Sequence, residues 1–251
     1  MNAAGVRRAV LVPPSWEGNR NDLVLEAATR YPDRFAAMGR ITLDDPASRG
    51  LLTGWRDQPG MLGLRLNLFN APGKAWLTDG TADWFWPAAE RAGIPLMILA
   101  TGSLEEVDEI AQRYPSLRMI LDHFSLHRAM NEAPFIDHSA IRKLTEMGRK
   151  PNVAVKASAL PLFSSEAYPY RDLHEPIHRV FDAFGPRRLF WGTDLTRLPC
   201  TYLQAVTLFT EELPWLTESD KEWVMGRGIC EWLNWPLQGP MNRLLKNASR
   251  T

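Results

Sequence analysis

The chain has 251 residues, of which 45% are hydrophobic and 23% charged, so its composition is that of a globular protein and excludes a disordered or collagen-like one. Lys plus Arg equals Asp plus Glu at 29 each, and a formal net charge of zero argues against binding to nucleic acid or to an acidic membrane. Two cysteines are too few for a disulfide framework or a four-thiolate metal site, and they fit a reducing compartment.

The sequence also lacks the features of a membrane or secreted protein. No apolar run approaches the roughly 18 residues of a membrane span. Residues 1–10 have no long apolar core after a charged start, as a signal peptide would. We therefore expect a cytoplasmic protein with neither a membrane nor a nucleic-acid partner.

Short apolar runs alternate with helical patterns along the chain. Most of these runs are continuously apolar, which is typical of parallel strands buried on both faces. Strands are predicted at residues 8–12, 36–41, 63–68, 95–99, 118–122, 152–156 and 188–192. Helices are predicted at residues 21–31, 46–55, 84–92, 103–114, 137–148, 173–184 and 217–226.

This alternation predicts an α/β fold with a parallel sheet and right-handed crossovers. The sheet would be either open and doubly wound or closed into an eight-stranded barrel, and seven strands are one short of a barrel. No long Gly-, Ser- or Pro-rich linker divides the chain, so residues 1–251 are expected to form a single domain.

In either architecture the functional residues follow the carboxyl ends of the strands. Asp194 follows the apolar run 189–191 through a Gly-Thr step, where a carboxylate can bind a metal or accept a proton from water; the alternative is a helix cap. His123 ends another strand and can bind a metal or transfer a proton; the alternative is a histidine bonded to a nearby carbonyl. Asp122 is expected to alternate to the opposite face of that strand and to be structural.

Three cations are candidates for binding an anionic substrate. Arg65 and Lys156 lie within otherwise apolar strands, and a buried cation of this kind must be paired with a substrate carboxylate or with a structural counterion. Arg197 comes three residues after Asp194, and its alternative is an exposed loop residue. The motifs of nucleotide-binding loops, serine esterases and zinc proteases are absent from the sequence.

Several segments resemble the amidohydrolase-related enzymes. The most specific is FGPRRLFWGTD at residues 184–194, which is similar to the pattern FG-x-(D/E)-R-(L/I)-(M/L)-(F/W)-G-(S/T)-D. AGVRRAVLV at residues 4–12, GLRL at residues 63–66, LDH at residues 121–123 and NVAVKAS at residues 152–158 resemble further strands of that family. The resemblance covers residues 3–237 and is strongest to the branch of 2-pyrone-4,6-dicarboxylate lactonases.

The resemblance implies a TIM-type (β/α)8 barrel in which Asp194 is the acid/base or metal-binding aspartate and His123 the strand-end histidine. It implies one divalent metal, zinc or manganese, in full-length relatives. The family's first strand carries His-x-His, which this sequence lacks, and Met1 aligns with the second strand. We therefore expect a barrel truncated at its N-terminus, with seven of eight strands. The strand-4 end reads Ala100-Thr101-Gly102 where decarboxylases of the family have a histidine.

With at most His123 and Asp194 as ligands, the chain has fewer than the three that catalytic zinc requires, so we expect weak metal binding or none. The resemblance implies hydrolysis of a small carboxylated lactone. In this reaction Asp194 would activate water, His123 would polarise or protonate the leaving oxygen, and Arg65, Lys156 and Arg197 would hold carboxylates. The alternatives are a metal-dependent aromatic-acid decarboxylase and an inactive barrel. An exposed sheet edge would be covered by a second copy of the chain, by residues 232–251, or by pairing of the two edges.

Overall fold

The structure is a computed structural model that describes residues 1–129 and 131–237. Its centre is one parallel sheet whose order, β1-β2-β3-β4-β5-β6-β7, follows the chain. The predicted strands are confirmed: β1 (Ala9–Leu11), β2 (Phe35–Gly39), β3 (Met61–Asn67), β4 (Leu96–Leu99), β5 (Met119–Leu121), β6 (Val153–Ala157) and β7 (Leu189–Trp191).

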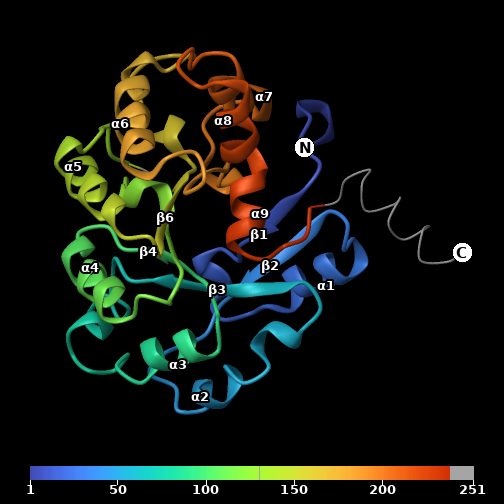
Figure 1. Cartoon of the computed structure of the whole chain (residues 1–251), viewed down its shortest axis with the longest axis vertical. Helices are drawn as coiled ribbons and strands as arrows, with labels where there is room; N and C mark the ends of the chain where they lie inside the picture. Colours follow the sequence, from blue (N-terminus) through green and yellow to red (C-terminus); the bar gives the residue numbers. More distant parts are fainter. Residues whose placement is uncertain (130, 238–251) are drawn as a thin grey trace, which may run out of the picture.

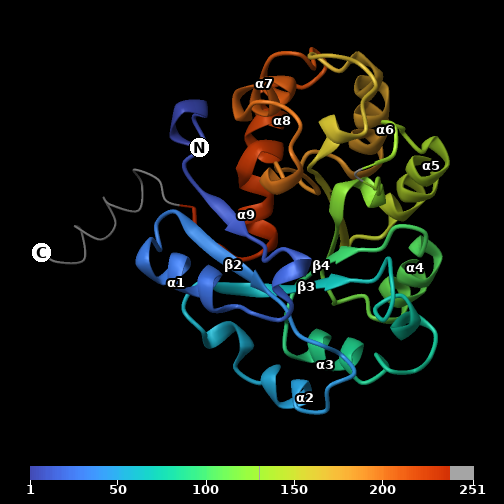
Figure 2. The same ribbon diagram turned by 180° about the vertical axis from the view of Figure 1, so that it is seen from behind.

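Helices surround this curved sheet (Figures 1 and 2). The predicted helices are found, several of them shorter than expected: α1 (Asp22–Arg30), α2 (Ser48–Leu51), α3 (Phe85–Arg91), α4 (Leu104–Arg113), α5 (His138–Glu146), α6 (His174–Phe184) and α8 (Glu218–Glu222). Consecutive parallel strands that curl inside a layer of helices make an incomplete TIM barrel. None of the helices in the described residues is long and apolar enough to cross a bilayer.

Two helices were not predicted from the sequence, α7 (Tyr202–Thr210) and α9 (Gly228–Trp232). Thr201 and Gln204 form a reciprocal capping box that begins α7, and this Thr-x-x-Gln spacing is a signal that the sequence does contain. α9 is hard to recognise because a π-helical turn at Trp223–Arg227 separates it from α8.

The inner face of the sheet is packed against the C-terminal part of the chain. Each of β2 to β7 contributes at least one side chain, among them Met38, Met97 and Phe190, and these pack with Cys230, Leu233 and Trp235. A second, larger apolar core lies between the outer face of the sheet and the surrounding helices. The segment that includes α9 thus fills the interior below the mouth of the barrel.

The sheet does not close between its first and last strands. β1 pairs only with β2, and β7 only with β6, among the described residues. The π-helical turn and α9 pack against β7 and lie beside β1, where Arg8 donates to the Pro236 carbonyl at 2.8 Å (Figure 1). The covering that β7 receives comes mainly from residues 223–232, which precede most of the expected segment 232–251, and residues 238–251 of that segment lie outside the described residues.

Candidate active site

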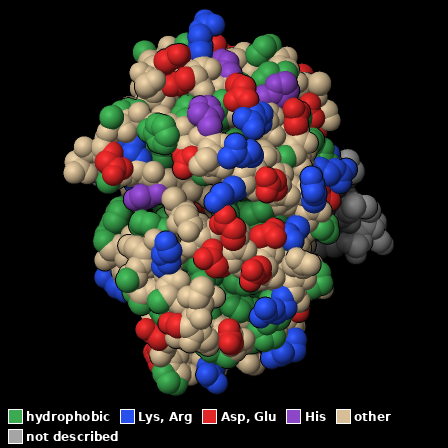
Figure 3. Space-filling model, turned by 90° about the vertical axis from the view of Figure 1, so that its left-hand side faces the viewer, with side chains coloured by type: hydrophobic (Ala, Val, Ile, Leu, Met, Phe, Trp, Pro, Cys, Tyr) green, Lys and Arg blue, Asp and Glu red, His purple; other side chains and the backbone are tan. Residues whose placement is uncertain are grey.

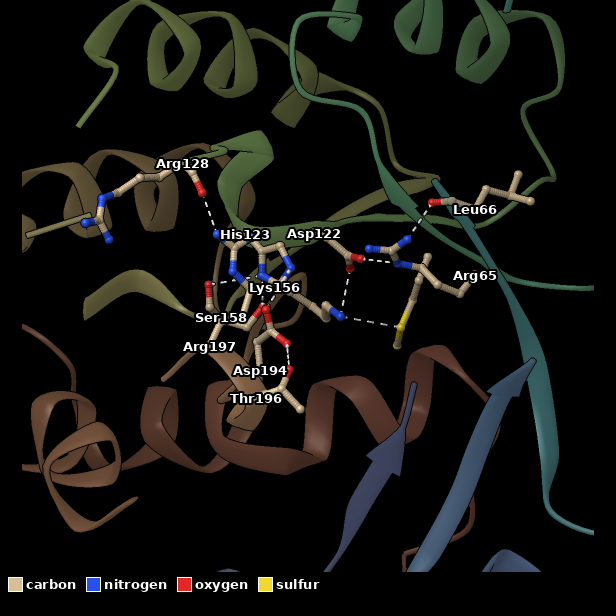
Figure 4. Close-up of polar contacts among 11 residues, drawn as sticks. Arg65, Leu66, Asp122, His123, Arg128, Lys156, Ser158, Asp194, Thr196 and Arg197 are labelled. Atoms are coloured by element: carbon tan, nitrogen blue, oxygen red, sulfur yellow. Dashed lines mark hydrogen bonds and ion pairs between the residues drawn. The ribbon is translucent and has the colours of Figure 1, made fainter. Parts of the chain in front are cut away.

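Three buried ionic groups from three strands meet at the mouth of the barrel. The Asp122 carboxylate follows β5 and lies 2.5 Å from Arg65 Nε of β3 and 2.7 Å from Lys156 Nζ of β6 (Figure 4). Their side chains are 1%, 9% and 14% exposed. Burial raises the pKa of Asp122, but Lys156 and then Arg65 outweigh this and hold it well below its usual value. Asp122 is therefore ionised and is the counterion of both cations.

The expectation that Asp122 faces away from His123 is wrong, because the strand does not continue through these residues. β5 ends at Leu121, and His123, Phe124 and Ser125 have φ angles of 53°, 54° and 55°. Left-handed backbone breaks the alternation of a strand, so both side chains reach the same cavity. Three such residues in a row, none of them glycine, mark a conformation that the surrounding packing must impose.

His123 lies between Ser158 and Asp194. Its Nδ1 is 3.2 Å from the Ser158 carbonyl oxygen and 2.8 Å from Ser158 Oγ, and its Nε2 is 3.6 Å from Asp194 Oδ2. We assign the ring proton to Nδ1, because the carbonyl oxygen can only accept and because 3.6 Å is too long for a hydrogen bond to Asp194. Nε2 is then an acceptor, and it converges with the Asp194 carboxylate on one point of the cavity.

Burial lowers the pKa of His123 to about 4, although Asp122 opposes this shift. The ring is therefore neutral at pH 7. A neutral imidazole beside a carboxylate offers two proton acceptors to one water molecule, which is a geometry suited to activating that water.

Asp194 follows β7, and its own backbone is left-handed, with φ 49° and ψ 61°. Asp194 stands at the N-cap position of the short 3-10 helix Leu195–Arg197, but its side chain accepts no capping hydrogen bond there, so its carboxylate does not serve as a helix cap. A Cβ at Gly192 would lie 3.2 Å from Ser158 Cβ, so the small residue lets the end of β7 approach the residue that holds His123. Thr196 Oγ1 donates to Asp194 Oδ1 at 3.5 Å, and Oδ2 faces His123 (Figure 4).

All five residues singled out from the sequence line one cavity of about 1260 Å³: Arg65, His123, Lys156, Asp194 and Arg197. Arg197 is half-buried and donates through Nη2 to the Arg128 carbonyl. It thus differs from Arg65 and Lys156, which are bound to the Asp122 carboxylate.

Two further polar residues of this cavity were missed by the sequence reasoning. Arg40 follows β2, and Asn67 ends β3. Arg40 Nε and Asn67 Oδ1 are both buried without a hydrogen-bond partner. Their positions at strand ends were a usable signal, since Asp122, His123 and Asp194 also follow the ends of strands.

The donor set does not match a complete catalytic metal site. His123 Nε2 and Asp194 Oδ2 are two suitable ligands, whereas catalytic zinc has three protein ligands. Within residues 1–129 and 131–237, no group of three His, Cys, Asp or Glu side chains is arranged to hold a metal ion. Asp194 was expected to be a metal ligand, and among the described residues His123 is the one other side chain placed to bind the same ion.

Known proteins similar to this chain share one family. A family model described as amidohydrolase matches residues 1–240. The L-fucono-1,5-lactonase of Burkholderia ambifaria is 29% identical over 197 residues, which are 76% of this chain and 65% of that protein. The matched part therefore spans slightly less than two thirds of that relative.

Solved structures show the same fold. A probable 2-pyrone-4,6-dicarboxylic acid hydrolase of Acinetobacter baumannii, with citric acid bound, has a TM-score of 0.74 and 19% identity over 93% of this chain and 86% of that chain. An amidohydrolase of Burkholderia multivorans with bound zinc has a TM-score of 0.75 and 20% identity over 94% of this chain and 86% of that chain.

Proposed function

Because this chain belongs to the amidohydrolase family, we propose that it hydrolyses the ester bond of a small carboxylated lactone. The observation that carries the proposal is the pair of proton acceptors, Asp194 and neutral His123, placed 3.6 Å apart in a cavity with a cationic wall. The name of one similar protein, a lactonase, supports a lactone as substrate, and the name of another, a dicarboxylic acid hydrolase, supports a substrate that carries carboxylates.

In this reaction a water molecule would lie between Asp194 Oδ2 and His123 Nε2. As its oxygen attacks the lactone carbonyl, Asp194 takes the proton and a new C–O bond forms. The tetrahedral intermediate then collapses, the ring C–O bond breaks, and the leaving oxygen receives the proton to give a hydroxy acid. His123 can donate a proton to the leaving oxygen only after its Nε2 has accepted one. In the resting ring the proton is on Nδ1, which is bound to Ser158 and faces away from Asp194.

The cations stabilise negative charge during these steps. Arg65 and Lys156 share the single counterion Asp122, so the three groups carry a net positive charge in a buried place. Such a fixed charge favours the oxyanion of the intermediate without having to reorganise. Arg197, which lines the same cavity and is not bound to Asp122, is our candidate for holding a substrate carboxylate.

A similar amidohydrolase holds zinc, and the described residues of this chain offer two donors for such an ion, His123 Nε2 and Asp194 Oδ2. If a divalent cation binds, His123 and Asp194 would be its ligands. We propose that the binding is weak.

We propose a cytoplasmic enzyme whose partner is a small anionic molecule, and a second copy of the chain that pairs with the edge of β1. In the described residues the backbone of β1 is hydrogen-bonded on one side only, and side chains alone meet its other side, which supports the second copy.

The test is Asp194→Asn, assayed for ring opening of carboxylated lactones. Asparagine tolerates the left-handed backbone of position 194, so the fold should be kept while the proton acceptor is lost. We expect kcat to fall about 10²- to 10⁴-fold, the usual contribution of a general base.

Asp182→Asn is the matched control, since Asp182 is 68% exposed on α6. An Asp194→Asn variant with wild-type kcat would contradict the assignment. Release of CO2 from an aromatic acid, with no ring opening of a lactone, would favour the decarboxylase alternative.

A further inference from the structure

Arg40 is a cavity cation whose charge has no counterion among the described residues. Asn21 fixes its backbone, donating to the Arg40 carbonyl at 3.0 Å and accepting from the Arg40 N–H at 2.8 Å. The guanidinium itself has one long contact, from Nη1 to the Pro13 carbonyl at 3.4 Å, and Nε has no partner. No described carboxylate lies within ion-pair distance of it. The backbone of Arg40 is thus held in place, whereas its guanidinium makes only this one long hydrogen bond.

The other two cations of the inner wall differ from Arg40 in this respect. Arg65 and Lys156 are bound to Asp122 at 2.5 and 2.7 Å. Burial, and then repulsion by Arg65, lower the pKa of Arg40 to about 10, although Asp122, which is beyond ion-pair distance, attracts the charge and opposes this shift; the guanidinium stays charged at pH 7. A charge that is partly desolvated and unpaired is costly to the folded state, and an anion that enters the cavity removes that cost.

We propose that Arg40 binds a carboxylate of the substrate and makes the enzyme select carboxylated lactones over neutral ones. This assignment rests on the proposed lactone hydrolysis and names the group that would recognise the acid. The fork of guanidinium N–H donors matches the two oxygens of a carboxylate. Arg40 follows β2, whereas His123 and Asp194 follow β5 and β7, and all three line the same cavity, so one substrate molecule can contact both the cation and the acceptor pair.

The experiment uses two lactones that differ in one group, 5-oxotetrahydrofuran-2-carboxylate and its carboxamide. Wild type, Arg40→Gln and Arg40→Lys are compared by the ratio of kcat/KM for the acid to kcat/KM for the amide. We expect this ratio to fall about 10- to 100-fold in Arg40→Gln, mainly through KM for the acid, which is the usual strength of a hydrogen bond to a charged group. Arg40→Lys should restore part of the ratio. Arg30→Gln, an exposed arginine of α1, is the matched control.

If Arg40 only stabilised the fold, Arg40→Gln would unfold at a lower urea concentration than wild type. Loss of an unpaired buried charge should leave the urea midpoint of Arg40→Gln equal to or above that of wild type. A lower midpoint together with an unchanged ratio overturns the proposal. A ratio equal in wild type and Arg40→Gln, or a wild type without preference for the acid, also overturns it while lactone hydrolysis itself stands.

Direct binding separates this proposal from the proposed function. Calorimetric titration of the acid into wild type and Arg40→Gln needs no turnover. If neither lactone is hydrolysed but the acid binds wild type and not Arg40→Gln, lactone hydrolysis fails and the role of Arg40 stands. If the acid binds both proteins equally, or neither, the role of Arg40 is overturned.

Discussion

Asp122 and His123 are adjacent in the chain and share one buried environment, yet they end up with different charges. Burial disfavours the charged form of each. Asp122 stays ionised because two cations touch it, whereas His123 stays neutral because the nearest anions only partly compensate its burial. The site therefore keeps a fixed charge and a titratable acceptor side by side.

A pH dependence of stability follows from His123. Its pKa is about 4 in the folded chain and about 6.5 when unfolded, so the unfolded state binds more protons between these values. We expect stability to be complete above pH 6.5 and to fall by about 3 kcal/mol as the pH drops to 4. Urea unfolding at a series of pH values measures this change.

His123→Asn removes the titrating ring and keeps a residue that tolerates a φ of 53°. Its stability should lose this slope between pH 6.5 and 4, while His138→Asn, at the exposed start of α5, should keep it. Parallel profiles for wild type and His123→Asn would show that burial does not act on the ring in this way.

For single residues, the sequence predicted which strands carry polar side chains at the mouth of the barrel but not which of these side chains form ion pairs with one another. Lys156 and Arg65 were ambiguous between a substrate and a structural counterion, and the structure supplies Asp122 as the counterion. Periodicity alone placed Asp122 on the wrong face, because it holds only while the backbone remains extended, and residues 123–125 are left-handed. Arg40 was missed because its lack of a counterion is visible only in three dimensions.

At the scale of elements, arginines hold the C-terminal segment below the sheet. Arg118, next to β5, donates to the Trp232 carbonyl at 2.5 Å, and Arg56 donates to the Leu233 carbonyl at 3.1 Å. Arg8 lies 3.6 Å from the ring centre of Trp235. Carbonyls at a helix C-terminus lack partners within the helix and carry partial negative charge, so cations stabilise the end of α9.

Arg118→Met tests this attachment. Methionine keeps an apolar side chain of comparable length but cannot donate to the Trp232 carbonyl, so we expect a loss of about 1–2 kcal/mol in urea unfolding. Amide hydrogen exchange should also quicken in residues 229–235. Arg113→Met, at the exposed end of α4, is the control and should change neither measurement. Unchanged exchange in Arg118→Met would mean that apolar packing alone holds the segment.

The order of strands and helices could be predicted from the sequence, because a strand is a short continuous apolar run whereas a helix has apolar residues every three or four positions. All seven strands were found, since continuous apolar runs bounded by turns are hard to mistake. α9 was not, because it has five residues and follows a π-helical turn in which Gly226 has φ 173° and ψ −40°. Short elements are defined by what they pack against, and that partner is far away in sequence.

At the scale of the whole molecule, neither sign of charge is in excess, and the two signs are mixed on the face that Figure 3 draws. Figure 3 shows lysine and arginine interspersed with aspartate and glutamate across one face. This agrees with a formal net charge of zero. Attraction for an anionic substrate must therefore come from the cavity, where Arg40, Arg65, Lys156 and Arg197 gather, rather than from a field over the whole surface.

The metal content of the 251-residue chain tests the two-ligand site. After dialysis against zinc and then against buffer, elemental analysis should find well under one equivalent, since two protein ligands bind zinc less tightly than three. Any zinc that remains should decrease further in His123→Asn and in Asp194→Asn, since each substitution removes one of the two ligands. One tightly held equivalent that either substitution removes would show that these residues complete a metal site.

The unclosed sheet has a mechanical consequence. β1 is joined to β2 over three residue positions, and its other side meets α9 through side chains and the Arg8 contacts. A force that draws residue 8 away from residue 236 would load the Arg8–Pro236 bond and the Trp235 contact first, and then peel β1 from β2 one pair at a time. Peeling breaks hydrogen bonds in succession, whereas shear loads them together. In an optical-trap experiment this end of the molecule should therefore yield at low force, before the strands that hold Asp122, Lys156 and Asp194.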